Sequence, residues 1–292
     1  MAAENAGAHA PTAGEYIQHH LQHLQMNFSF EGVKQTSIVD FSLFNLDSVF
    51  YSIVLGVIGC FVLWAGARKA TSGVPGRFQA AVEILSEMVE NQAKGVIHNA
   101  KSRKLISPLA LTVFVWIFLM NAMDMLPVDL IPAAWHAAGP ALGFKDYMRV
   151  VPTADLSTTL GLSCSVLFIC LVYNIKIKGL GGWAHELIAA PFGDHWALWP
   201  VNFLMQMIEY LAKTVSHGMR LFGNMFAGEL VFMLIALMGG GWALSATGVG
   251  LAIGHILAGT VWTLFHILVI TLQAFIFMML TLIYTGQAHD AH

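Results

Sequence analysis

Five stretches of this chain are apolar for long enough to cross a lipid bilayer, and they leave few other folds open. Three of them, 49–67, 108–126 and 156–175, have about the ~20 residues that a membrane helix needs. Hydrophobic residues make up 57% of the 292 residues and charged residues only 11%, far below the ~25% of soluble domains. The sequence therefore predicts an all-α polytopic membrane protein.

The last two apolar stretches, 199–238 and 249–284, are longer than a bilayer requires. At ~1.5 Å per residue, helices over these ranges would be about 55 to 60 Å long, whereas the hydrocarbon core is ~30 Å thick. Such helices must tilt steeply or break. Gly239, Gly240 and Gly241 lie between the two stretches and favour a turn, so we expect a tilted helical hairpin.

Residues 76–97 differ from the spans, because apolar side chains such as Phe78, Val82 and Val89 recur at helical spacing among glutamates. This pattern predicts one amphipathic helix on the membrane surface. We expect 47–292 to form a single membrane domain and 1–46 an extramembrane segment in front of it. Asp47 is expected to cap the first span, and the histidines of the N-terminal segment to be solvated.

The cations indicate the orientation. The segment between the first two spans is cytoplasmic by the positive-inside rule, because it carries Arg68, Lys69, Arg77, Lys94, Lys101, Arg103 and Lys104. The N-terminus is then outside, and five crossings put the C-terminus in the cytoplasm. A net charge of −3 gives no case for nucleic-acid binding. His185 and Glu186 begin an HExxH-like pattern, but Ala189 occupies its last position, so we expect no metal and no cofactor.

Two ionisable residues interrupt the otherwise apolar stretch from Met219 to Met238. Arg220 costs at least ~2.5 to 3.5 kcal/mol at membrane depth and stays charged, because its pKa lies above ~12. It can attract and release an anionic group but cannot relay protons by losing its own. Glu229 can be neutral or charged, as a proton carrier must be.

Helical geometry separates these two groups. At about 100° per residue, six polar side chains lie within roughly 40° of the Arg220 direction. They are Gln206, Glu209, Lys213, Ser216, Arg220 and Asn224. Glu229 falls on the opposite face, so a regular helix excludes an ion pair between Arg220 and Glu229. For Glu209 and Lys213 two interpretations stay open. They are surface charges that reach the headgroups or pair with each other across four residues, or they take part in ion movement.

The last apolar stretch has a polar stripe of its own, formed by His255, His266, Gln273 and Tyr284. His266 is a plausible proton-relay partner for Glu229, because imidazole titrates near physiological pH. Gln273 could hydrogen-bond Arg220 without neutralising it. The acidic residues Asp124, Asp129 and Asp155 of the outward loop fit two roles, namely loop or cap residues and an outer ion-access path.

The segments Gly218 to Glu229 and Phe265 to Phe275 resemble the signature of subunit a of bacterial F-type ATP synthases. Further segments are similar to that family in the same order, and the resemblance extends over nearly everything after Asp47. They are Ala70 to Phe78, Pro108 to Trp116, Asn121 to Pro127 and Arg149 to Asp155.

The resemblance implies a stator subunit of the bacterial inner membrane, without catalysis of its own, beside a rotating ring of c subunits. Two offset half-channels would carry ions to and from the c-ring carboxylates, and the b subunits and the remainder of the F1Fo complex would be further partners. By this resemblance Arg220 attracts each rotor carboxylate and blocks a leak. Glu229 and His266 match the outer half-channel, Asn224 and Gln273 match neighbours of the arginine, and Ser216 matches the inner path.

The sequence departs from the family at Gln206, where a glutamate is common on the inner path. Glu209 lies one turn closer to Arg220, and we infer that it takes over this role. A stand-alone channel or secondary transporter is the alternative function, but Arg220 and Glu229 have no counterpart in the first half of the chain, as inverted repeats would require. The choice between protons and sodium remains open, since it is expected to depend mainly on the rotor.

Overall fold

The computed structural model describes residues 13–27, 32, 40, 42–71, 73–127, 130–138, 148–189, 192–193, 195–240 and 245–289. Within these ranges five helices are long and apolar enough to cross a membrane. They are α2 (Leu46–Arg68), α4 (Ala100–Ala122), α6 (Leu156–Ala189), α7 (Trp199–Gly240) and α8 (Ala246–Gly286). The predicted all-α polytopic membrane fold is confirmed.

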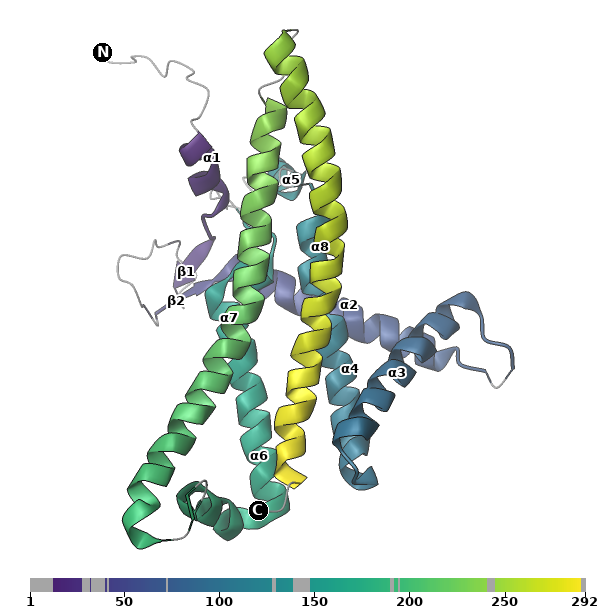
Figure 1. The fold of residues 1–292 in the computed structure, drawn as a ribbon. Coiled ribbons are helices and arrows are strands. Elements are labelled where there is room, and N and C mark those ends of the chain that lie inside the picture. Colours follow the sequence, from purple (N-terminus) through teal and green to yellow (C-terminus); the bar gives the residue numbers. More distant parts are fainter. Residues whose placement is uncertain are drawn as a thin grey trace.

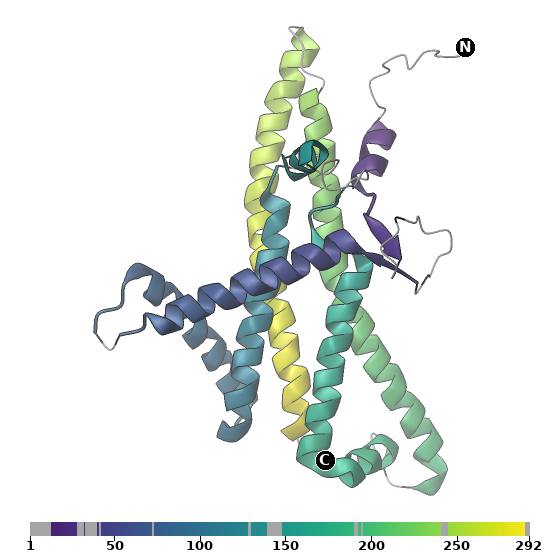
Figure 2. The same cartoon turned by 180° about the vertical axis from the view of Figure 1, so that it is seen from behind.

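The helices run in two very different directions. Helices α4, α6, α7 and α8 lie roughly along one another, whereas α2 crosses them at a steep angle (Figures 1 and 2). Helix α2 has 23 residues, about 35 Å, which matches a bilayer when upright. Helices α7 and α8 have 42 and 41 residues, about 60 Å each. When α2 stands upright in the bilayer, α7 and α8 are strongly tilted, because α2 crosses them at a steep angle. This agrees with the predicted tilted hairpin.

The amphipathic surface helix is α3 (Arg77–Val96), which buries Val89 and Ala93 and leaves its glutamate-rich side outward. Helix α3 packs closely against α2, since a Cβ atom on Gly66 of α2 would come within 2.8 Å of Val82 Cγ2 on α3. Glu90 of α3 accepts a hydrogen bond of 2.6 Å from the Ser107 hydroxyl of α4. The cation-rich connection between the first two spans is thus a folded unit.

Two helix boundaries differ from the predicted spans. Helix α4 begins at Ala100, before Pro108, because the Asn99 side chain accepts the Lys101 N–H at 2.9 Å and caps an earlier, polar turn. Helix α6 continues beyond residue 175, and its direction changes at Gly179, whose φ of 73° is accessible to glycine. The length of an apolar run predicts neither the charged first turn of α4 nor the kinked C-terminal extension of α6.

Short elements outside the spans were not predicted. The N-terminal segment forms α1 (Ala13–His20) and β1 (Gln25–Asn27), and β1 pairs antiparallel with β2 (Leu43–Asn45), so that Met26 faces Phe44. Helix α5 (Leu130–Ala138) follows a 3-10 turn at Met123–Met125. Pro132 lies in the first turn of α5, where the missing N–H costs nothing.

The core lies where α4, α6, α7 and α8 pack together. Met120, Met225, Met278 and Leu282 are fully buried there. Helices α6 and α7 touch closely because Gly218 has no side chain, and a Cβ atom there would come within 2.9 Å of Leu160 Cδ2 and 3.1 Å of the Thr159 carbonyl oxygen. Small residues allow this kind of backbone approach in membrane helices.

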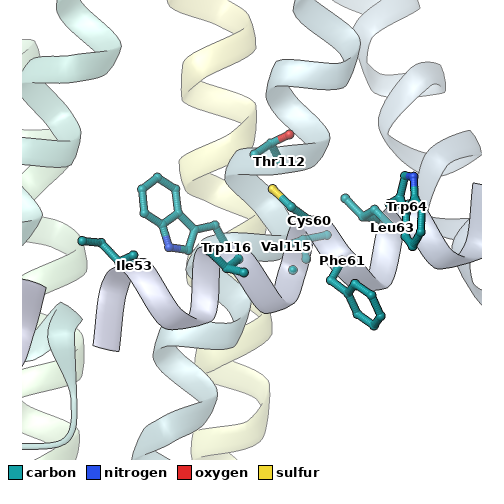
Figure 3. A pocket seen from close by; sticks show the side chains of 11 residues that line it. Ile53, Cys60, Phe61, Leu63, Trp64, Thr112, Val115 and Trp116 are labelled. Atoms are coloured by element: carbon teal, nitrogen blue, oxygen red, sulfur yellow. The ribbon is translucent and has the colours of Figure 1, made fainter. Parts of the chain in front are cut away.

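A groove of about 610 Å³ lies between α2 and α4 (Figure 3). Its lining includes Ile53, Val57, Phe61, Trp64 and Val115, and it is apolar almost throughout. Such a lining suits hydrocarbon and offers no ligand to an ion. The predicted site residues Arg220, Glu229 and His266 lie elsewhere, on α7 and α8.

We predict that Gly218→Ala lowers the stability of the α6–α7 contact. Overpacking against Leu160 and Thr159 costs about 1 to 3 kcal/mol, more than the gain of up to ~1 kcal/mol in helix propensity. The thermal midpoint of the purified protein should fall. Gly223→Ala on the same helix is the matched control, because a Cβ atom there meets nothing within 4 Å. Equal midpoints for the two variants would contradict this packing.

Candidate functional site

The predicted polar stripe on α7 is largely exposed, although Gln206 and Lys213 are half-buried. Ser216, Arg220 and Asn224 all lie on the exposed side of the helix. Among the residues that the structure describes, Arg220 makes neither a hydrogen bond nor an ion pair. The nearby apolar side chains of Val215 and Met219 are each 44% exposed. An uncompensated arginine in an apolar, exposed membrane surface indicates a partner that supplies an anionic group.

Glu229 lies on the opposite, buried side of α7, as the helical geometry predicts. Only 6% of this residue is exposed. The expected separation of Arg220 and Glu229 is therefore present. Gln273 on α8 is buried, and the described residues contain no hydrogen bond between it and Arg220. Gln273 remains a predicted neighbour of the arginine rather than a bound one.

The carboxylate of Glu229 is paired with Arg149, which precedes α6. Arg149 Nε donates to Glu229 Oε1 at 3.2 Å, and Arg149 Nη2 donates to Oε2, so the contact is bidentate. The guanidinium also lies over the ring of Phe226, 5.7 Å from its centroid. Arg149 itself is only 5% exposed. A buried carboxylate and a buried guanidinium thus compensate each other.

His266 is paired with Asp124 rather than with Glu229. Its Nε2 atom lies 2.7 Å from Asp124 Oδ2, and both side chains are almost fully buried. The ring fits because residue 228 is glycine: a Cβ atom there would lie 2.3 Å from His266 Cε1. Phe232 and Trp262 surround the same ring. Two buried acid–base pairs, Glu229 with Arg149 and Asp124 with His266, therefore contact α7 on its buried side.

The other predicted acidic positions have different surroundings. Asp155 caps α6, because its carboxylate accepts the Ser157 N–H at 3.0 Å, and it also accepts from Asn45 Nδ2 at 3.0 Å. Asp129 lies outside the described residues. Asp47 is fully buried and is not the N-cap of α2, a position that Asn45 holds. The expected capping role of Asp47 is therefore wrong.

Glu209 and Lys213 form the ion pair that their spacing allows, with 2.5 Å between Glu209 Oε1 and Lys213 Nζ. Lys213 also donates to Gln287 Oε1 at 3.0 Å and lies over the ring of Tyr284. Glu209 is exposed, so this pair is accessible and weak. Pairing does not exclude a role in ion movement, and that role remains a prediction.

Arg149 and His23 are the residues that sequence reasoning missed. Arg149 had been named only as the first residue of a segment that resembles the family, and the N-terminal histidines were expected to be solvated. His23 instead lies 2.9 Å from Arg149 Nη1 through its Nε2 atom. One signal was available, because a glutamate placed in an apolar stretch needs a counter-charge, and the outward loop offers Arg149. No cluster of metal-ligating side chains occurs within the described ranges.

Residues 49–286 match the family model described as ATP synthase A chain. The chain belongs to the ATP synthase subunit a family. It is 70% identical to ATP synthase subunit a of Acidovorax sp. (strain JS42), over 98% of this chain and 99% of the relative. The identity is also 70% to that of Paracidovorax citrulli over the full length of both, and 47% to that of Shewanella piezotolerans over 98% of this chain and 99% of the relative. The resemblance inferred from the motifs is confirmed.

We predict that Arg149→Met destabilises the protein by about 3 to 5 kcal/mol, because it leaves the buried Glu229 carboxylate without a counter-charge. Adding Glu229→Gln should restore much of this loss, since a neutral amide needs no cation. Thermal unfolding of the single and double variants measures both effects. If the double variant is no more stable than Arg149→Met, the buried ion pair is not the cause.

Proposed function

We propose that this chain is the stator of an F-type ATP synthase and moves protons to and from the carboxylates of a rotating c-ring through two offset half-channels. The observation that carries the proposal is the exposed Arg220, which has no counter-charge among the described residues although it lies on a membrane helix. A rotor carboxylate that passes this surface would supply the missing anion. The tilt of α7 and α8 lets one long helix pair follow the curved side of a ring.

Each half-channel has its own residues in this proposal. Outer protons reach the rotor by way of the buried groups on one side of α7, namely Asp124, His266, Glu229 and Arg149. Asp155 and Asp129 are further proposed members of this outer access path. Ser216 and Glu209 belong to the inner path, and Asn224 and Gln273 are polar neighbours of the arginine. Arg220 separates the two paths, because a fixed cation repels a proton and holds a deprotonated carboxylate.

The proposed assembly follows from the family. We place the chain in the F1Fo complex of a bacterial inner membrane, with the c-ring against the Arg220 surface and the b subunits of the peripheral stalk as further partners. The N-terminus faces outward and the C-terminus faces the cytoplasm, in keeping with the cations between α2 and α4. The chain itself carries no ATP chemistry. Its contribution is to couple ion flow to rotation.

We predict that Arg220→Ala abolishes ATP-driven proton pumping in inverted membrane vesicles while the complex still assembles. Without the cation, a rotor carboxylate has no counter-charge at the boundary between the paths. Arg77→Ala, which removes an exposed arginine of α3, is the control and should pump normally. Pumping at the parent rate by an assembled Arg220→Ala complex would refute the role of Arg220.

We also predict that Glu209→Gln slows proton release on the cytoplasmic side, because an amide cannot accept a proton. The rate of ATP synthesis should fall over several cytoplasmic pH values. Lys213→Met serves as the comparison, since it breaks the same ion pair but keeps the carboxylate. If Glu209→Gln matches the parent throughout, Glu209 is only a paired surface charge.

A further inference from the structure

Arg149 contacts a third group besides the two oxygens of Glu229, and that group comes from the N-terminal segment. His23 Nε2 lies 2.9 Å from Arg149 Nη1. The arginine can only donate, so this imidazole nitrogen must be the acceptor and must carry no proton. The proton of a neutral His23 is then on Nδ1, which lies 3.4 Å from Asp47 Oδ2. The contact with Arg149 thus fixes one tautomer of one neutral ring.

Asp47 also contacts both His23 and Arg149, through hydrogen bonds to the backbone beside or at these residues. Its Oδ2 atom accepts the backbone N–H of Leu24 at 3.0 Å and that of Arg149 at 3.2 Å, and its Oδ1 atom accepts the N–H of Ser48 at 2.8 Å. One carboxylate therefore joins the residue after His23, the backbone of Arg149 and the first turn of α2. It is fully buried, as a carboxylate with this many donors can be.

We propose that His23 and Asp47 are positioning residues for Arg149, so that the N-terminal segment forms part of the outer ion path. His23 fixes the outer end of the guanidinium and Asp47 fixes the backbone beneath it, which leaves Nε and Nη2 facing Glu229. This inference rests on the proposed function, because it concerns how Glu229 is presented in the outer half-channel. It assigns a role to a segment that lies before the membrane domain.

Protonation of His23 has a defined consequence in this arrangement. A second proton on Nε2 would replace the acceptor by a donor and put two cations side by side, so Arg149 would lose its outer anchor. The charged groups around His23 are Asp47 of α2, Arg149 before α6 and Glu229 of α7. Outer acidity would thereby loosen the hold of Arg149 on Glu229.

The test uses the complete complex in proteoliposomes, where an acid–base transition drives ATP synthesis and the pH of each compartment is set separately. His23→Leu removes the acceptor, and the rate should fall by a factor of roughly ten, the effect of one charge-assisted hydrogen bond. His23→Gln keeps an acceptor that does not titrate. It should restore most of the rate and flatten its dependence on outer pH. Gln22→Leu, at an exposed neighbouring position, is the matched control.

Two results would overturn the proposal: equal rates for His23→Leu and Gln22→Leu, or equal losses and unchanged outer-pH profiles for His23→Leu and His23→Gln. The first means that His23 does not act on the path, and the second that the ring only fills space. Arg220→Ala is measured beside them. If that variant synthesises ATP at the parent rate, the half-channel function itself fails, whatever the His23 variants do.

Discussion

Two helices of about 60 Å in a hydrocarbon layer of ~30 Å are the constraint on which the other features of this protein depend. The excess length forces α7 to lie strongly tilted. One side of α7 is exposed, and the other side packs against α6, α8 and the turn before α6. Arg220 lies on the first side and Glu229 on the second. A single helix therefore carries two ionisable groups at membrane depth that do not neutralise each other.

Most of the fold could be predicted from the sequence, because spans, tilt and amphipathic periodicity are local or depend on length. The opposition of Arg220 and Glu229 is equally local, since nine residues of regular helix fix it. The structure adds the boundaries that apolar runs do not determine. Asn99 starts α4 early through a side-chain cap, and Gly179 turns α6 through a positive φ.

The partners of the buried groups could not be predicted in the same way. The Arg149 and Glu229 side chains are 80 residues apart in sequence, and His23 and Arg149 are 126 apart. Helical spacing contains no information about such contacts. The pairing of His266 with Asp124 rather than Glu229 depends on Gly228, whose missing side chain decides where the ring can lie. The exposed stripe was easier to predict, because helical periodicity alone places its residues on one side of α7.

The Asp47 contacts also bear on how the protein is made. Asp47 belongs to the first membrane helix to be synthesised, whereas Arg149 follows 102 residues later and Glu229 later still. On the ribosome, Asp47 is therefore inserted with its donors Leu24 and Ser48 but before the Arg149 N–H exists, and Arg149 enters before the glutamate that it will hold. The ion pair between Arg149 and Glu229 can form only after α7 has been inserted. A nascent chain that stalls earlier therefore holds Arg149 without its carboxylate partner.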